Sequence, residues 1–282
     1  MNLSERHCLG CTLPGMAAKP ETYPIDTGEA EVHHEPDGSM VLLVNGVPSS
    51  HIVPGEPQRL DFPYMRWIAD FLDSLQHRGA SDLPRWPKPR LTHLGGAACS
   101  LPRYFAAAWP SSRNTVVEID SRLAELAREL FDVPRSPAVK IRVGDAREVT
   151  DSFKPATRDV MIRDVFAQAL TPRELTTVEF YHQVRTCLSE TGVYVANCGS
   201  HADLKEAKEE LAGMCEVFPH VAAIADPPML KGRRYGNIVL IGANTPLEAS
   251  PQLTRNLLKG AVPAHFKGEK WARGLATTPR HD

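Results

Sequence analysis

The 282-residue chain has no excess of charge of either sign, since 32 Lys and Arg oppose 34 Asp and Glu and leave a net charge of −2. This balance gives no electrostatic reason to expect nucleic acid or an anionic membrane as a partner. Long apolar runs are also lacking, because no stretch of about 18 residues is apolar enough to span a bilayer. The first residues lack the basic-then-apolar layout of a secretory signal. We therefore expect a cytoplasmic protein.

Cysteine is sparse, and only Cys8 and Cys11 have the spacing of a metal or redox motif. A structural zinc ion needs four ligands, whereas this C-x-x-C has only His7 beside it and no second pair. We therefore expect no metal, and a zinc or redox protein is the least favoured hypothesis. The other four cysteines are interpreted as small apolar residues in a reducing compartment.

Turn-forming residues divide the first part of the chain into three segments. Residues 1–28 carry Gly and Pro at intervals that interrupt any periodic pattern, and we expect a disordered arm. Residues 29–60 contain Asp37-Gly38 and Asn45-Gly46, which favour hairpin turns, and predict an antiparallel β unit of about three strands. Residues 61–89 combine an amphipathic helix, FPYMRWIADFLDSL, with a Pro-rich connector.

From residue 90 onward, apolar strands alternate with helical patterns, which is typical of the α/β class. A short, turn-rich link joins the last two strands, so we expect the final strand to be antiparallel. The pattern predicts a doubly wound, mostly parallel seven-stranded sheet. Residues 246–282 are expected to form a helical segment and a loose tail. The predicted strands cover residues 91–94, 115–119, 138–143, 159–165, 192–198, 221–225 and 237–243.

Glycine or acidic residues stand at the ends of four consecutive predicted strands. In a doubly wound sheet, ligands bind beyond the carboxyl ends of the strands. Gly95-Gly96 allows the backbone to approach a ligand closely. Glu118 follows Gly95 by 23 residues and suits the two hydroxyls of a ribose. Asp145 is placed to accept a hydrogen bond from an adenine amino group, and Asp164 faces the same crevice. Residues 90–245 are therefore predicted to form an adenosyl-binding domain.

These residues also have purely structural interpretations. A Gly pair after a strand is often only a tight turn. Glu118, Asp120 and Asp145 are suited to cap the helices that follow them. Asp164 could form a surface ion pair with a neighbouring arginine. Because the four groups occur in order at consecutive strand ends, the sequence favours an adenosyl ligand.

Seven motifs in a fixed order extend this interpretation. They are LLVNGV (42–47), DFPYM (61–65), GGAAC (95–99), EID (118–120), GDA (144–146), RDVMIRD (158–164) and LTPRELTTVEFYHQVRTCLSETG (170–192). With these motifs the chain resembles, over about residues 30–245, the spermidine synthases. These are polyamine aminopropyltransferases with the Rossmann-like fold of class I S-adenosylmethionine-dependent methyltransferases. The resemblance implies a transferase of polyamine biosynthesis that forms a homodimer.

The resemblance also implies roles for individual residues. Asp164 matches the catalytic aspartate, which accepts or orients the proton of the amine substrate. Tyr64 matches a tyrosine that lines the amine channel, so Tyr64 and Asp164 are the expected substrate-binding residues. The donor is expected to be decarboxylated S-adenosylmethionine, and no metal is required. The residues expected to bind the donor are Gly95, Gly96, Glu118, Ile119, Asp145 and Ala146.

The departures from the family pattern lie on the amine side. A dicationic diamine needs carboxylates, because a buried ammonium without an opposite charge is costly. We therefore expect an amine acceptor other than putrescine, unless Glu174 or Glu179 compensates. The replacements are Ala98 for the Gly-loop aspartate, Ala167 for a second carboxylate, Ser49 for a glutamine, Met65 and Arg66 for a polar residue and a glutamate, and Leu230 for a tyrosine.

Two alternatives stay open. The first is a methyltransferase that uses S-adenosylmethionine on a small molecule, with Arg66 or Arg103 paired to the donor carboxylate. The second is a non-catalytic adenosyl-binding homologue, which the presence of Asp164 disfavours.

Overall fold

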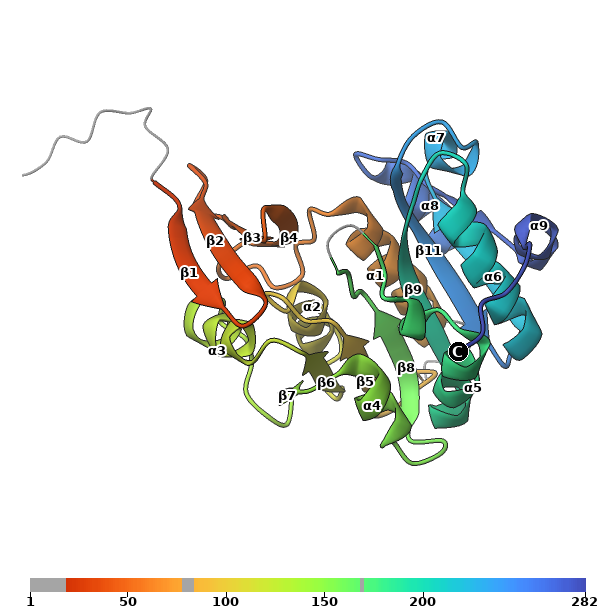
Figure 1. Ribbon diagram of the computed structural model, residues 1–282, viewed down its shortest axis with the longest axis horizontal. Helices are drawn as coiled ribbons and strands as arrows, with labels where there is room; N and C mark the ends of the chain where they lie inside the picture. Colours follow the sequence, from red (N-terminus) through yellow and green to blue (C-terminus); the bar gives the residue numbers. More distant parts are fainter. Residues whose placement is uncertain (1–18, 78–83, 168–169) are drawn as a thin grey trace, which may run out of the picture.

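The computed structural model describes residues 19–77, 84–167 and 170–282. The Cys8/Cys11 motif therefore lies outside the described residues. Two sheets organise the chain, and Figure 1 shows the smaller one to the side of a larger α/β body.

The smaller sheet is an antiparallel meander in the order β1-β2-β3-β4. Its strands are β1 (Glu21–Ile25), β2 (Gly28–His34), β3 (Met40–Val44) and β4 (Val47–Ile52). The predicted hairpin at Asn45-Gly46 is confirmed, with φ of 51° and 76° at these two residues.

The prediction of a disordered arm as far as residue 28 was wrong for residues 21–28, and the unit has four strands instead of three. Contacts distant in sequence stabilise β1 and the turn that follows it. The Thr27 amide and hydroxyl each donate to Asp120 at 2.7 Å, and Asp26 accepts a hydrogen bond from the Ser121 amide at 2.8 Å. Local turn residues do not reveal such partners.

The larger sheet has the order β12-β10-β11-β9-β8-β5-β6-β7. Strands β9, β8, β5, β6 and β7 are parallel, and β11 is antiparallel to both of its neighbours, as predicted. In the described part of the chain this sheet has eight strands rather than seven, because β12 pairs with β10. The bounds are β5 (Arg90–Leu94), β6 (Arg113–Glu118), β7 (Val139–Val143), β8 (Arg158–Arg163), β9 (Leu188–Ser200), β10 (His220–Ala225), β11 (Gly236–Ala243) and β12 (His265–Lys267).

Helices cover both faces of this sheet. Helix α1 contacts α2 and α8, whereas α5 contacts α4 and α6, and α6 contacts α9. Figure 1 shows α5 and α6 in front of the sheet and α1 behind it. The central strands β8, β9 and β11 are buried along most of their length, as two covered faces require. The helices are α1 (Pro63–Gln76), α2 (Ser100–Ala108), α3 (Ser121–Leu130), α4 (Ala146–Asp151), α5 (Val178–Cys187), α6 (Lys205–Val217), α7 (Pro227–Leu230), α8 (Pro251–Lys259) and α9 (Glu269–Leu275), with a 3-10 turn at Arg173–Leu175.

The C-terminal tail packs onto the body, so the prediction of a loose tail was wrong. Asp282 accepts from Arg147 Nη2 at 2.7 Å and from the Thr177 hydroxyl at 2.7 Å. The Asp282 amide donates to Glu179, and the His281 ring bonds to the same carboxylate. Arg147 belongs to α4, Glu179 belongs to α5 and Thr177 caps α5, so all three lie far from the tail in sequence.

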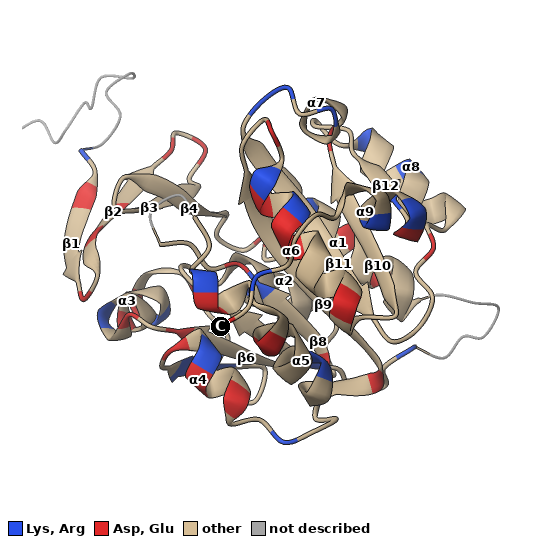
Figure 2. Cartoon of the chain, turned by 45° about the vertical axis from the view of Figure 1, so that its right-hand side comes forward, with Lys and Arg blue, Asp and Glu red and all other residues tan. Residues whose placement is uncertain are grey.

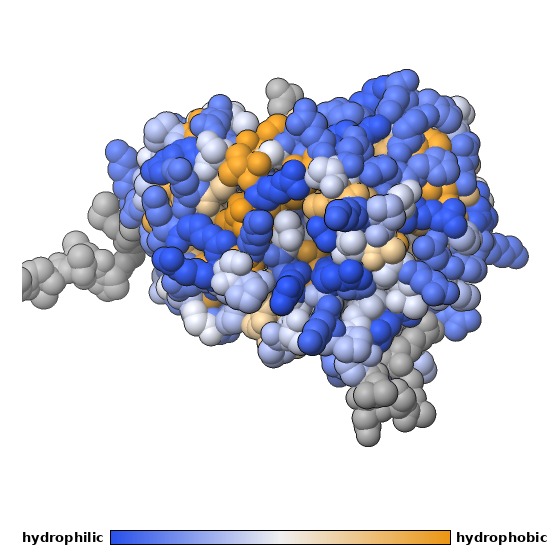
Figure 3. Space-filling view, turned by 90° about the horizontal axis from the view of Figure 1, so that it is seen from below, coloured by the Kyte–Doolittle hydropathy of each residue, from blue (hydrophilic) through white to orange (hydrophobic). Residues whose placement is uncertain are grey.

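Charged residues of both signs are mixed over the outer helices, as expected from the small net charge (Figure 2). On the face shown in Figure 3 most residues are hydrophilic, and hydrophobic residues appear in separate patches. None of the described helices is both long and apolar enough to cross a bilayer.

Candidate active site

The Gly95-Gly96 turn follows β5 and requires glycine at both positions. Gly95 has φ +86°, and a Cβ there would lie 2.2 Å from the backbone oxygen of Asp164. A Cβ on Gly96 would lie 2.6 Å from Val116 Cγ1. The backbone of β5 thus runs very close to the end of β8, so the turn and Asp164 share one edge of the sheet.

Glu118 ends β6 and faces this turn. Its Oε2 accepts from the Gly96 and Ala97 amides at 3.0 and 3.2 Å, and its Oε1 accepts from the Asp120 amide at 3.2 Å. The helix-capping role falls to Asp120, which accepts from the Leu123 amide at 2.7 Å. Glu118 is therefore not a cap, and its carboxylate lies against the loop.

The ends of β6 and β7 present apolar side chains. Ile119 is 60% exposed and Val143 52% exposed, and Val143 is paired in register with Glu118. Asp145 caps α4 through its Oδ1, which accepts from the Arg147 and Glu148 amides. Ala146 is buried at the start of α4. Exposed apolar residues at a strand edge suit the face of a flat ring such as adenine, and Val143 was not predicted.

Asp164, directly after β8, binds two neutral side chains. The Tyr64 hydroxyl donates to Oδ2 at 2.9 Å, and Asn197 Nδ2 donates to Oδ1 at 2.8 Å. Asn237 Nδ2 in turn donates to Asn197 Oδ1 at 3.0 Å. The surface ion pair considered for Asp164, with Arg163 or Arg173, is wrong. Arg163 is fully buried and pairs with Glu210, and Arg173 donates to the His281 carbonyl. No role was predicted for Asn197 from the sequence. A polar amide inside the otherwise apolar run GVYVANC could have indicated a functional position.

Burial raises the pKa of Asp164, while the hydrogen bonds from Asn197 and Tyr64 act in the opposite direction. Burial and the adjacent carboxylate raise the pKa of Tyr64 well above its usual value. The pair is therefore a carboxylate hydrogen-bonded by a neutral phenol. A carboxylate whose pKa is raised by burial is a better base than an exposed one.

The Ala98 position is closed to solvent. Ala98 is fully buried in an apolar cluster with residues of the small sheet and α3, and its amide donates to Ser50 Oγ at 3.2 Å. Ala97 and Cys99 on either side have positive φ, 43° and 59°. A carboxylate at residue 98 in this loop conformation would enter an apolar core, so the alanine fits the backbone that surrounds it.

Arg66 and Arg103 are the two arginines considered as partners for a donor carboxylate, but Arg66 bonds to another segment and Arg103 lies in another pocket. Arg66 Nη2 donates to the Val262 carbonyl at 3.3 Å, which draws its side chain toward the segment after α8. Arg103 lines a separate pocket between α2 and the loop before β7. Ala167 is exposed, and Leu230 packs on the main core from α7.

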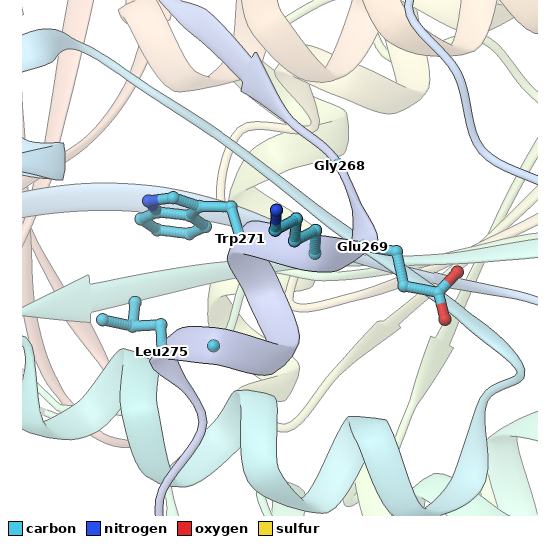
Figure 4. Close-up of a pocket in the computed structure, with 6 residues that line it drawn as sticks. Gly268, Glu269, Trp271 and Leu275 are labelled. Atoms are coloured by element: carbon cyan, nitrogen blue, oxygen red, sulfur yellow. The ribbon is translucent and has the colours of Figure 1, made fainter.

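A larger hollow of about 690 Å³ lies along α9 and is shown in Figure 4. Its lining residues include Trp271, Leu275 and Lys270, and none of the strand-end residues described above. Among the described residues, no group of three or more His, Cys, Asp and Glu side chains is placed to hold a metal ion.

A spermine/spermidine synthase domain matches residues 33–236, which include strands β3 and β4 of the small sheet, the Gly turn, Glu118 and Asp164. The chain belongs to this family. A probable spermidine synthase from Corynebacterium glutamicum ATCC 13032 is 54% identical, with a TM-score of 0.86 over 93% of this chain and 96% of that one. The resemblance inferred from the sequence motifs is thereby confirmed.

Other relatives agree with this assignment. The polyamine aminopropyltransferase of Vibrio vulnificus (strain CMCP6) is 30% identical over 153 residues, which are 53% of this chain and 47% of the relative. The match thus spans less than half of that curated protein. Human methyltransferase-like protein 13 in complex with SAH is 22% identical, with a TM-score of 0.52 over 68% of this chain and 86% of that one, and it supports the methyltransferase-like fold. The spermine/spermidine synthase family is a family of transferases, and its aminopropyltransferase members act on small amines.

Proposed function

We propose that this spermidine-synthase family member transfers the aminopropyl group of decarboxylated S-adenosylmethionine to an amine with fewer positive charges than putrescine. The observation that carries the proposal is the environment of Asp164, a partly buried carboxylate whose hydrogen-bond partners are the neutral side chains of Tyr64 and Asn197. The Gly turn and Glu118 beside it support an adenosyl donor.

The donor half of the site is assigned by the chemistry of its groups. Glu118 offers carboxylate oxygens to the ribose hydroxyls, at the cost of its bonds to the loop amides. Asp145 Oδ1 already caps α4, which leaves Oδ2 for the amino group of adenine. Ile119 and Ala146 provide apolar contact next to these oxygens.

In the transfer step, the lone pair of the acceptor nitrogen attacks the aminopropyl carbon bound to the sulfonium. The new C–N bond forms as the C–S bond breaks, and the sulfur leaves as neutral methylthioadenosine. The nitrogen's proton passes to Asp164, the base at the end of β8. Most of the acceleration comes from placing the amine in line with the C–S bond and keeping it deprotonated.

The acceptor assignment follows from where the other carboxylates lie. Glu179, one of the residues considered as compensating, binds His281 and the Asp282 amide. Glu174 is exposed in the 3-10 turn. Glu206, near the end of β9, accepts from Ser200 Oγ and from the amide and ring of His201. A second ammonium at Asp164 would thus meet amides and a phenol, which do not balance its charge.

Titration calorimetry with methylthioadenosine, S-adenosylmethionine and its decarboxylated form tests the donor. We expect the decarboxylated donor to bind more tightly than S-adenosylmethionine. We also expect Glu118→Ala to weaken binding of the decarboxylated donor at least about tenfold. The variant would lose one or two hydrogen bonds between the ribose hydroxyls and a charged carboxylate. Glu125→Ala on the exposed side of α3 is the matched control and should bind normally. Preference for S-adenosylmethionine would instead support methyl transfer, and absence of binding by all three would support a non-catalytic homologue.

A further inference from the structure

A second pocket, of about 280 Å³, lies on the outer side of α2, where the loop after β4 and the loop between α3 and β7 meet. Its walls are formed mainly by small and apolar residues, and its two charged members are Arg103 and Asp132. The lining residues include Pro57, Arg103, Ala106, Asp132, Pro134 and Ala138, and none of the residues assigned to the donor or to the amine.

Arg103 is unusual because it is 4% exposed and yet, throughout the described part of the chain, makes no hydrogen bond and no ion pair through its side chain. Two other arginines with little exposed surface have polar partners for their guanidinium groups. Arg163 binds Glu210, and Arg128 donates to the carbonyls of Val133, Pro134 and Val139. Buried charges in proteins are normally paired, because an unpaired charge away from water is unfavourable. The guanidinium of Arg103 lines the pocket without a hydrogen-bonded partner, and Asp132 acts on it only at longer range. A guanidinium in this setting points to an anionic group supplied by a ligand.

Asp132 restricts what that ligand is. It lies in the same pocket wall, is exposed, and has a left-handed backbone with φ 47°, but it forms no ion pair with Arg103 in the described structure. A multiply charged anion such as phosphate would be repelled by this carboxylate. A molecule with one carboxylate and one ammonium would satisfy both charges, and Ala106 with the prolines offers apolar contact between them.

We propose that this pocket is a second ligand site for a small amino-acid-type zwitterion, whose carboxylate binds Arg103 and whose ammonium faces Asp132. The site is separate from the strand-end residues and does not depend on the identity of the amine acceptor. The guanidinium acts as a bidentate donor to the carboxylate, and Asp132 gives selectivity over simple carboxylates.

The test is a titration of the full-length protein, labelled with ¹⁵N-arginine, in which the side-chain Nε–H signals are followed. The probes are glycine, acetate and inorganic phosphate at equal ionic strength. The Arg103 signal is assigned by its disappearance in Arg103→Gln, and Arg122→Gln on exposed α3 is the control. We expect a saturable shift of the Arg103 signal with glycine, at least about tenfold tighter than with acetate or phosphate. Saturation of the donor site with methylthioadenosine should leave this glycine-induced shift and its affinity unchanged.

Asp132→Asn gives an independent readout if Arg103→Gln does not fold. It should reduce the preference for glycine over acetate while keeping acetate binding. The proposal is overturned if no probe gives a saturable shift, if acetate or phosphate binds as tightly as glycine, or if methylthioadenosine competes with glycine.

Discussion

The Tyr64 hydroxyl lies 2.9 Å from Asp164 Oδ2 although the two residues are 100 positions apart in sequence. This contact joins the first turn of α1 to the end of β8. It places an amine-side residue and the proposed base in a single hydrogen-bonded group. We derive three measurable predictions from the polar network around Asp164. A fourth concerns His93, which is buried in β5.

Tyr64→Phe should shift the acidic limb of the pH–rate profile upward. The Tyr64 hydrogen bond stabilises the ionised carboxylate, so its loss raises the pKa of Asp164 further above the usual value, and the base is then protonated at higher pH. We expect a shift of about 0.5–1 pH unit, the equivalent of one net hydrogen bond. Tyr104→Phe is the matched control, because it removes a phenol from a different carboxylate, Asp73. An acidic limb identical to that of the unmodified enzyme would contradict this assignment.

Asn197→Ala should lower kcat about tenfold, since it removes the donor to Asp164 Oδ1 and leaves that oxygen free to turn. Asn237→Ala acts only through the orientation of Asn197 and should cost less, about two- to fivefold. The Kd for methylthioadenosine, measured by calorimetry, should stay unchanged in both variants. Equal losses in the two variants, or a weakened Kd, would mean that the asparagines support the fold and not the base.

Glu210→Gln should destabilise the protein by about 3–5 kcal/mol, because the fully buried Arg163 would lose the carboxylate with which it pairs in the described structure. Urea unfolding measures the loss. Glu125→Gln, which breaks the exposed Arg122–Glu125 pair, should change the free energy of unfolding by less than about 0.5 kcal/mol. A similar small change for Glu210→Gln would show that the buried pair is not stabilising.

Stability should fall in mild acid because of His93. Burial lowers the pKa of this histidine to about 4 from 6.5, so the unfolded chain binds a proton that the folded one does not between these values. The contribution is present in full above pH 6.5 and is lost as the pH falls to 4, which amounts to about 3 kcal/mol. Urea unfolding at pH 7 and pH 5, compared with His93→Gln, measures it. A pH slope that is the same in both proteins would exclude His93 as the cause.

Part of this site was accessible from sequence because its elements are defined locally. Gly95, Glu118 and Asp164 each end a short apolar run, and parallel strands bring such ends to one edge. The final antiparallel strand followed in the same way from the length of its connection.

What the sequence did not show depends on distant partners. β1 is stabilised by contacts with the start of α3, and the C-terminal Asp282 by Arg147 and Thr177. The burial of Ala98 arises where α2 meets the small sheet, and the roles of Asn197 and Asn237 arise from the pairing of β9 with β11. Strand periodicity carries no information about any of these contacts.

The most direct test of the proposed acceptor compares two amines that differ by one charge. Initial rates with decarboxylated S-adenosylmethionine are measured for putrescine and for n-butylamine, which has the same carbon chain without the second ammonium, with Asp164→Asn as the inactive control. We expect kcat/KM for n-butylamine to equal or exceed that for putrescine, since the described partners of Asp164 offer no second negative charge. A preference for putrescine of tenfold or more, about 1.4 kcal/mol, would contradict this account.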